Sequence, residues 1–514
     1  MAIKKYTANA DNTLTNAFKF NLSTRATGSN LGASDVLEVF HIYGQATTSS
    51  AENARVVVQF PVGNISSDRS NGTIPASGSV DFILRLYNAK HGQTLPKNYS
   101  MHISAVKTAW EEGEGLDMEG YTDLTYDQTG SNWTNRAGST AWVKTGGDYF
   151  VDASSSFTAS FVSGEEDIEV NITTLVEQWM NSTGNVLGSK TNNGVLIKLK
   201  GDAEEAVKSY YTKKFFSRSS QYFYKRPTIE ARWDSTKKDH RGRFYFSSSV
   251  APGSDNLQTL YLYNVVNGRL RNIPGVKPVS GGTLMVSLYS GSHGPTGGKL
   301  KLNKGGGVVT TGHTNATGGF VETGIYSCSL AFTGATTKRG DTFLETLYDV
   351  WHNGTVGAGG TEFATGTITP YRFKTSFYNP NKTYVMSITN LKNTYSTKEV
   401  GARFRLFTRE DDWNPNIYTV ASTDANGEIL DDVYYKVVRI TDGLEIIPFA
   451  TGAATPQDVG TNASYTRLSY DTSGSYFDLD MSMFEPGYAY GLQFMYYYND
   501  SYREQPEIFK FRVE

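Results

Sequence analysis

The sequence predicts an all-β protein built from tandem β-sandwich or jelly-roll-like domains, with one short helix near residues 174–181. Two observations carry this prediction. The chain holds 51 glycines and 33 tyrosines, a composition that suits strands and turns better than helices. Short segments with two-residue hydrophobic alternation recur along most of its length. With 514 residues, the chain is also long enough for several domains.

Alternation is clearest in the first region. In FILRLYN, Phe82, Leu84 and Leu86 fall on one face of the expected strand, and YSMHISAV repeats the pattern from Tyr99. The residues 1–30 are polar, with FKFNL at Phe18–Leu22 as the expected first strand. Further strands are expected at Val36–Gly44, Ala54–Val62, Asp167–Ile172, Val195–Lys200 and Arg226–Trp233.

The predicted helix lies in TTLVEQWMN. Leu175, Val176 and Trp179 recur at helical spacing, and Thr173 or Thr174 is expected to cap the amino end. The Ser-Thr-Gly that follows Asn181 is expected to end the helix.

A tryptophan-rich loop, Ala109–Trp142, interrupts the strands and holds three of the seven tryptophans. Long structureless loops are uncommon in compact domains, so we expect these rings to pin the loop as a plug against a sheet face. Glu112 is expected to contact Arg136 and fix the loop ends. The predicted structural anchors are Trp110, Glu112, Trp133, Arg136, Trp142, Trp179 and Trp233.

The order of these motifs resembles the DNRLRE (disaggregatase-related) family. The resemblance covers Val36 to Trp233 and rests on ARVVVQF, FILRLYN, W-E-E-G, N-W-T-N-R, DIEVNITTLVEQWMN, NNGVLIKL, FFSRSS and RPTIEARW. It implies a β-sandwich of the kind found on bacterial and archaeal surface proteins beside polysaccharide-active or adhesive modules. The chain departs from the family pattern by the acidic insertion EGLDMEGYTDLTYDQ. We assign residues 1–236 to this domain.

Two further β-sandwich domains are expected, at residues 237–370 and 371–514. The polar stretch Ser235–Arg243 marks the first boundary and Pro370 the second. Strands are expected in FYFSSSV, TLYLYNV, TLMVSLYSG, GGFVETGIYSCSLAF, FLETLYDVWHNG and EFATGTITP, and then in YRFKTSFYNP, YVMSITNL, ARFRLFTRE, IYTVASTD, DVYYKVVRI, SYFDLDM, YGLQFMYYYND and IFKFRV. The C-terminal half resembles uncharacterised structural proteins of tailed bacteriophages.

The densest acidic cluster lies at residues 111–127, within the tryptophan-rich loop. Its spacing matches no strict ligand pattern, so a solvated loop is the main interpretation, with a Ca²⁺ site and glycosidase carboxylates as alternatives. DANGEILDD holds half of a calcium-loop pattern, for which a hairpin turn is the preferred interpretation. The histidines show no zinc spacing, and Cys328 is expected to be a small buried hydrophobe. No catalytic residue, metal ligand or cofactor is predicted.

Two rows of tyrosines are candidates for recognition. Half of the rings in an alternating strand face a core, so a core or subunit-interface role is the main interpretation. The alternative is contact with a glycan or partner protein, because flat rings offer contact area at a low entropy cost. The candidate residues are Tyr222, Tyr224, Tyr496, Tyr497 and Tyr498.

Charge and termini narrow the function. A net charge of −3 gives no electrostatic reason for nucleic-acid binding, and no apolar run approaches the ~18 residues of a membrane span. The N-terminus lacks a signal peptide although the body is typical of extracellular β-proteins, a combination expected of a virion protein released by lysis. We therefore predict a non-enzymatic, self-associating structural component of a tailed-phage virion, in the neck, tail or a fibre-like appendage. The alternatives are a receptor-binding module for host polysaccharide and a polysaccharide depolymerase.

Overall fold

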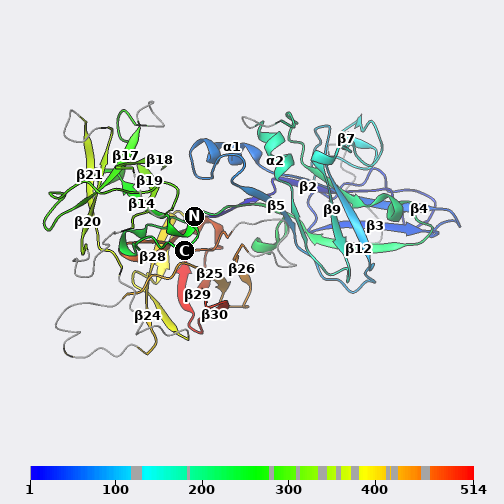
Figure 1. Cartoon of the computed structure of the whole chain (residues 1–514). Coiled ribbons are helices and arrows are strands. Elements are labelled where there is room, and N and C mark those ends of the chain that lie inside the picture. The colour runs from blue at the N-terminus through cyan, green and yellow to red at the C-terminus, as the bar shows by residue number, and fades with distance from the viewer. Residues whose placement is uncertain are drawn as a thin grey trace. The chain divides into compact units, whose positions relative to one another are not determined.

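A computed structural model describes residues 2–116, 130–181, 186–276, 283–307, 313–333, 344–354, 360–371, 381–412, 417, 427–452 and 464–514. These residues are almost all in strands and loops, as Figure 1 shows, so the prediction of an all-β fold with tandem sandwiches is confirmed. The chain forms two compact units. Unit 1 comprises Met1–Asp234, Ala450–Tyr465 and Ser482–Glu485, and unit 2 comprises Ser235–Phe449, Thr466–Met481 and Pro486–Glu514. The expected division of residues 237–514 into two domains stays a prediction.

Unit 1 is a sandwich of two antiparallel sheets. The smaller sheet has the order β1-β13-β5-β10, and the larger has the order β12-β3-β4-β11-β6-β9 with β2 also paired to β4. The strands are β1 (Ile3–Thr7), β2 (Ala10–Thr15), β3 (Val36–Tyr43), β4 (Ala51–Gln59), β5 (Asp81–Leu86), β6 (Tyr99–Ala105), β9 (Ser156–Phe161), β10 (Ile168–Asn171), β11 (Val195–Leu199), β12 (Tyr210–Phe216) and β13 (Thr228–Arg232). A small hairpin, β7 (Asn135–Ala137) with β8 (Thr140–Ala141), lies outside both sheets.

The core of unit 1 lies between the two sheets. Phe82, Leu84 and Leu86 of β5 belong to it, together with the side chains of β6 that begin at Tyr99. The expected inward faces of both strands are therefore confirmed. Alternation succeeds here because each strand buries one apolar face and leaves the other for polar or edge contacts.

The prediction for the N-terminus is wrong. The first strands are β1 and β2, and the expected strand at Phe18–Leu22 is absent, because only Phe18 makes a bridge, to Arg25. Hydrophobic alternation misses β2 because the side chains that it buries are largely polar, including Asp11, Asn12 and Thr13.

The expected helix is α2 (Thr173–Met180). The predicted threonine cap is wrong: the N-cap residue is Ile172, with no side-chain cap, and Thr173 instead donates its hydroxyl to Oδ1 of Asn171 at 2.6 Å. Asn181 ends the helix in the left-handed conformation, at φ 47°. Ser182, Thr183 and Gly184, which were expected to end the helix, lie outside the described residues.

The prediction of a single short helix is also wrong. A second one, α1 (Val62–Ser70), lies beside α2, and Arg69 forms a bidentate ion pair with Glu177 of α2 at 2.7 Å. Only Val62 and Ile65 of α1 are buried, so the sequence carries almost no helical hydrophobic pattern there. Single turns also occur at α3 (Gly201–Glu204), α4 (Gly253–Asn256), η2 (Ala153–Ser155), η3 (Phe223–Lys225), η4 (His240–Gly242) and η6 (Met481–Met483).

Unit 2 begins with a six-stranded antiparallel sheet of order β14-β19-β18-β17-β20-β21. Its strands are β14 (Gln258–Tyr263), β17 (Leu284–Ser290), β18 (Ala316–Glu322), β19 (Ile325–Leu330), β20 (Leu347–His352) and β21 (Glu362–Ile368), and a hairpin joins β15 (Val265–Val266) to β16 (Arg269–Leu270). Its core includes Trp351, Tyr326 and Cys328. The expected strand in FYFSSSV is absent, since Phe244 makes only a bridge to Pro370.

Two more sheets complete unit 2. They have the orders β22-β24-β28-β27 and β23-β31-β29-β25-β26, with β30 paired to β29. The strands are β22 (Tyr384–Ile388), β23 (Thr394–Tyr395), β24 (Val400–Glu410), β25 (Val433–Arg439), β26 (Glu445–Ile447), β27 (Ser469–Asp471), β28 (Gly474–Asp480), β29 (Ala489–Tyr498), β30 (Ser501–Glu504) and β31 (Phe509–Val513). Stacked rings join the sheets: Tyr435 of β25 lies 4.4 Å from Phe477 of β28 between ring centroids. The strands expected in YRFKTSFYNP and IYTVASTD fall almost entirely outside the described residues.

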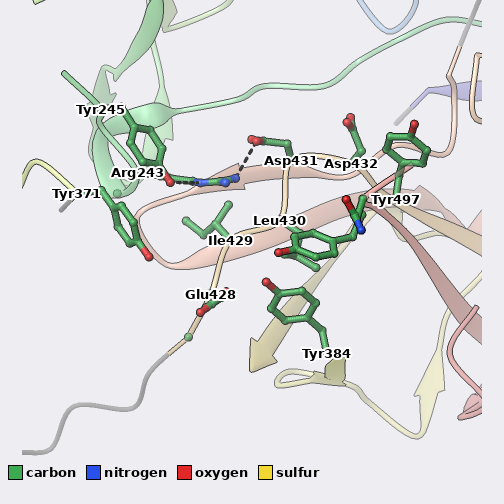
Figure 2. Close-up of a pocket in the computed structure, with 14 residues that line it drawn as sticks. Arg243, Tyr245, Tyr371, Tyr384, Glu428, Ile429, Leu430, Asp431, Asp432 and Tyr497 are labelled. Atoms are coloured by element: carbon green, nitrogen blue, oxygen red, sulfur yellow. Dashed lines mark hydrogen bonds and ion pairs between the residues drawn. The ribbon is translucent and has the colours of Figure 1, made fainter. Parts of the chain in front are cut away.

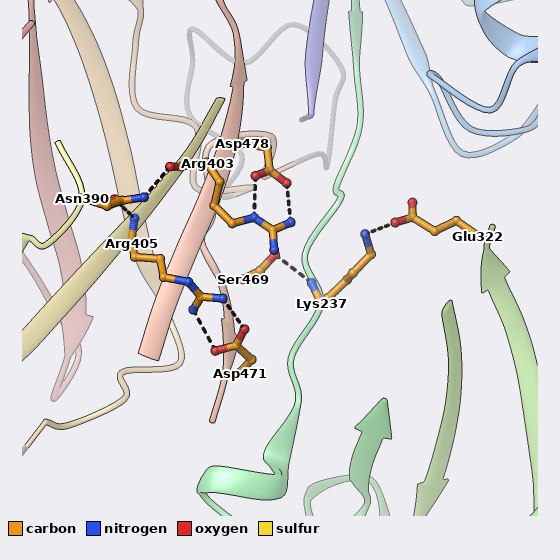
Figure 3. Close-up of polar contacts among 8 residues, drawn as sticks. All are labelled: Lys237, Glu322, Asn390, Arg403, Arg405, Ser469, Asp471 and Asp478. Atoms are coloured by element: carbon orange, nitrogen blue, oxygen red, sulfur yellow. Dashed lines mark hydrogen bonds and ion pairs between the residues drawn. The ribbon is translucent and has the colours of Figure 1, made fainter. Parts of the chain in front are cut away.

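Charged side chains tie β24 to its neighbours on the outer face, as Figure 3 shows. Arg403 donates two hydrogen bonds to Asp478, of 2.8 and 3.0 Å, and Arg405 donates two to Asp471, of 3.0 and 2.8 Å. Asn390 bridges the two arginines through their backbone atoms. Paired arginines of this kind fix the register of β24 against β27 and β28.

Candidate functional site

The described parts of the tryptophan-rich loop, residues 109–116 and 130–142, lie on the outer face of the larger sheet of unit 1. Trp133 and Trp142 are buried against Leu14, Val57 and Leu196, which point away from the main core. We call this set of residues, with the partly buried Trp110, the tryptophan plug. The structure thus places the loop as a cover over a second, smaller hydrophobic core.

Polar contacts orient the rings of the tryptophan plug. Trp142 donates its indole N–H to the carbonyl of Asn132 at 2.9 Å, and Trp110 donates to the carbonyl of Asn193 at 2.8 Å. The guanidinium of Arg55 lies over the ring of Trp133, 5.0 Å from its centroid. The indoles of Trp142 and Trp110 therefore combine apolar contact with a satisfied polar group.

The expected contact of Glu112 with Arg136 is wrong. Glu112 instead pairs with Arg218 through two hydrogen bonds and also accepts the backbone N–H of Asp11 at 2.8 Å. Arg136 donates to the carbonyl of Ala109 at 2.9 Å. Arg218 follows β12, about a hundred residues from Glu112, and sequence spacing carries no signal for such a pair.

Asp11 is the unusual group in this cluster. It is fully buried, and Oδ2 accepts the backbone N–H of Arg218 at 2.6 Å, while Oδ1 has no hydrogen-bond partner. Burial raises the pKa of Asp11 to about 7, and the nearby carboxylate of Glu112 adds to the rise. Asp11 therefore titrates close to neutral pH.

Four other carboxylates of the acidic cluster belong to residues 117–129, which the structure does not describe. Asp117, Glu119, Asp123 and Asp127 lie outside the described residues, so the Ca²⁺ and glycosidase alternatives stay predictions. Among the described residues, no three His, Cys, Asp or Glu side chains come together as metal ligands would.

The other predicted anchors of unit 1 lie in the main core. Trp179 on α2 and Trp233, directly after β13, are both buried there. They hold the helix and the last strand against the sandwich, apart from the tryptophan plug.

The tyrosines of the two rows differ in their burial and in their contacts. Tyr496 is buried and accepts the backbone N–H of Tyr384 at 3.3 Å, so it has the core role of the main interpretation, and the alternative of a glycan or partner contact is wrong for this residue. Tyr224 accepts the backbone N–H of Glu485 at 2.7 Å, a contact within unit 1. Tyr222 and Tyr497 remain exposed, at 49% and 38%.

Tyr497 and Tyr498 contribute to a cavity of about 290 Å³ in unit 2, which we call the tyrosine pocket (Figure 2). Its lining combines aromatic, apolar and charged side chains. The lining residues are Gly242, Arg243, Tyr245, Tyr371, Tyr384, Gly427, Glu428, Ile429, Leu430, Asp431, Asp432, Tyr497, Tyr498 and Asn499.

Two sets of rings face the pocket. Tyr245 and Tyr371 pack together on one side, with ring centroids 5.1 Å apart. On the other side Tyr384 makes an edge contact with Tyr498, at 5.6 Å. Ile429 lies between the two sides in Figure 2, so the rings form walls around an apolar floor.

Charged groups of the pocket are held in defined pairs. Arg243 contacts Asp431 at 2.8 Å and donates to the hydroxyl of Tyr245 at 3.1 Å. Asp431 also accepts the hydroxyl of Tyr470 at 3.0 Å. Asp432 has longer contacts, with Lys238 at 3.4 Å. These pairs fix the carboxylates in place while leaving the side chains of Asp431 and Asp432 47% and 33% exposed.

Glu428 also lines the tyrosine pocket. Burial raises its pKa, and a hydrogen bond with Glu410 acts in the same direction. Lys382 lies between these two glutamates, 3.5 Å from Glu428. The two carboxyl groups therefore contact the same cation, Lys382, which offsets their mutual repulsion.

Sequence reasoning found only Tyr497 and Tyr498 among the wall residues of the pocket. Glu428 was noted as part of a calcium-like pattern whose other members, Asp424 and Asn426, lie outside the described residues. The lining comes from separate stretches near residues 243, 371, 384, 430 and 498. No single motif holds them, and only the fold brings them together.

Neither a protein-family model nor a curated protein matches this sequence. The resemblance to the DNRLRE family therefore stays a prediction. None of the helices in the described part of the chain has the length and apolar character that a membrane crossing requires.

Proposed function

We propose that the chain is a non-enzymatic structural component of a tailed-phage virion, part of a neck, tail or fibre-like appendage. It acts through protein–protein contacts with other virion proteins and through self-association. Tandem β-sandwiches suit this role. The proposal assigns the protein no catalysis, no nucleic-acid partner and no membrane.

An exposed apolar hairpin is the observation that carries the proposal. Val265, Val266 and Leu270 on β15 and β16 are 57%, 43% and 40% exposed. The hairpin lies beside the turn between β18 and β19, since Asn264 donates its backbone N–H to the carbonyl of Gly324 at 2.8 Å.

Two further exposed apolar side chains lie on β18, which leads into the same turn. Phe320 and Val321, which precede that turn, are 39% and 40% exposed. We call these two residues and the three hairpin residues the apolar hairpin surface. Apolar side chains gathered on a surface of a water-exposed protein mark sites of association.

The polar clusters support a structural role as well. Glu112 is bound by Arg218, and Glu177 is bound by Arg69. Such carboxylates are occupied by internal partners and stabilise the fold, whereas a catalytic carboxylate needs to reach a substrate. The described polar clusters of unit 1 thus favour a scaffold over an enzyme.

The test of the virion assignment is the protein content of purified particles. We expect the chain in stoichiometric amounts by quantitative mass spectrometry. Its absence from purified, infectious particles contradicts the assignment.

Self-association has its own test, with sedimentation velocity of the full chain. Val266→Glu places a charge on the apolar hairpin surface, so we expect a shift from oligomer to monomer. Val151→Glu is the matched control, since Val151 is 78% exposed on unit 1. A native chain that stays monomeric, or an equal effect of both variants, rejects the hairpin as the contact.

A further inference from the structure

We propose that the tyrosine pocket binds a neutral, hydroxyl-rich sugar residue of a polysaccharide. This goes beyond the proposed structural role, because it gives the same protein a recognition site. The proposal rests on the shape, the rings and the polar groups of the pocket, taken in turn.

The size of the pocket fits a small part of a glycan. Its volume of about 290 Å³ lies at the lower end of the range for small-molecule sites. A sugar ring fits such a cavity, while the rest of a polysaccharide chain extends into solvent.

The accessible rings suit the apolar faces of a sugar. Tyr371 and Tyr497 are 47% and 38% exposed and stand on opposite sides of Ile429 in Figure 2. Tyrosine offers flat contact area with few rotatable bonds, so little entropy is lost when a ligand stacks on it. A sugar that stacks on either ring has apolar contact on one of its faces.

The polar groups suit hydroxyls, which both donate and accept hydrogen bonds. Asp431 and Asp432 supply exposed carboxylate acceptors, and Arg243 supplies donors. Hydrogen bonds to charged groups are stronger than those between neutral groups. Since Arg243 and Tyr470 already hold Asp431, its carboxylate is positioned before a ligand arrives.

Charge selects the class of sugar. The three carboxyl groups of the lining, on Glu428, Asp431 and Asp432, already contact the cations of Lys382, Arg243 and Lys238 in turn, so the pocket offers little net charge to attract uronic acids, phosphorylated sugars or amines. A quaternary ammonium is disfavoured too, because the guanidinium of Arg243 lies over the Tyr245 ring at 5.6 Å and occupies one cation-binding face. Neutral sugars remain.

The experiment uses the full chain on a glycan array that carries neutral, acidic and amine-bearing glycans. Saturation-transfer NMR then follows cellobiose, lactose and N,N′-diacetylchitobiose, with digalacturonate and choline as probes of the other two classes. We expect binding to at least one neutral class and none to digalacturonate or choline.

Matched variants locate the site. Tyr497→Ala removes an exposed ring of the pocket, and we expect it to weaken the dissociation constant about three- to tenfold. Asp432→Asn, which keeps the shape and removes the charge, weakens it less. Tyr222→Ala removes an exposed ring outside the pocket and leaves binding unchanged.

Three outcomes overturn the proposal: no neutral glycan bound, a preference for the acidic or cationic probes, or binding lost in Tyr222→Ala and kept in Tyr497→Ala. None of them bears on the presence of the protein in the virion, which mass spectrometry tests separately.

Discussion

The tryptophan plug of unit 1 and the tyrosine pocket of unit 2 use the same kinds of residues in opposite ways. Both combine aromatic rings with carboxylates and an arginine. In the plug, Trp133 and Trp142 are buried and Glu112 is bound by Arg218. In the pocket, Tyr371 and Tyr497 keep more than a third of their surface exposed.

The difference shows that exposure, more than residue type, separates a structural cluster from a recognition site. A ring that is buried in the free protein contributes its contact energy to folding, and an exposed ring keeps that energy for a partner. Changes in the plug should therefore alter stability, and changes in the pocket should alter binding. The predictions below test this contrast.

The largest expected effect is that of Trp133→Ala. The ring is buried against the sheet and stacked under Arg55, so its loss should lower the free energy of unfolding of unit 1 by about 3–5 kcal/mol. Trp110→Ala should cost less, because that ring is only partly buried. Urea unfolding followed by tryptophan fluorescence measures both. Equal losses for the two variants contradict this account of the plug.

The second effect is a pH dependence set by Asp11. The pKa of Asp11 is about 7 in the folded chain, against an ordinary value of 3.8. Between these two pH values, Asp11 therefore takes up a proton when the chain folds. Its stabilising contribution is complete below pH 3.8 and is lost as the pH rises through 7, by about 2–4 kcal/mol.

The measurement compares native protein with Asp11→Asn, whose side chain stays neutral, in urea unfolding from pH 5 to pH 8. The difference in the free energy of unfolding between the native protein and Asp11→Asn should change with pH. Other titrating groups, such as His102, contribute equally to both proteins and cancel in this difference. Asp202→Asn is the control at an exposed aspartate. A difference that stays constant from pH 5 to pH 8 shows that Asp11 does not titrate in this range.

The sequence predicted the fold where burial follows hydrophobic pattern. The inward faces of β5 and β6 came from alternation alone. The hydrophobic pattern did not predict β2, because this strand buries Asp11, Asn12 and Thr13. Polar residues of this strand are held by distant loops: Asn12, for example, donates to the carbonyl of Ser131 at 2.8 Å. Local pattern carries no information about partners so far away in sequence.

The same limit applies to the sites. A buried role for Trp133 and Trp142 was predictable because large rings in a long loop need a surface to cover. The pairing of Glu112 with Arg218, and the meeting of Tyr245 and Tyr371 with Tyr498, depend on the path of the whole chain. Residues close to one another in the sequence do not predict these contacts.

The third effect is the loss of the Glu112 ion pair. Arg218→Ala leaves the carboxylates of Glu112 and Asp11 without their cation, and this should lower stability by about 1–3 kcal/mol. The loss stays below that of Trp133→Ala because the Arg218 side chain is 36% exposed and water replaces part of the interaction. Arg136→Ala serves as the control, because the guanidinium of Arg136 donates to a backbone carbonyl, that of Ala109. A larger loss for Arg136→Ala than for Arg218→Ala overturns the assignment of Arg218 as the anchor.

The smallest expected effect on stability is that of Tyr497→Ala, and it completes the contrast. The ring is exposed and contacts partly exposed groups: its hydroxyl donates to Asp500 at 3.0 Å, and its centroid lies 4.8 Å from that of Tyr502, which is 44% exposed. We therefore expect an unfolding midpoint that matches the native protein, measured by far-ultraviolet circular dichroism. A clear drop in the midpoint means that the ring supports the fold of β29, and the contrast between plug and pocket fails at this residue. An unchanged midpoint, together with weakened sugar binding, separates the two roles within a single side chain.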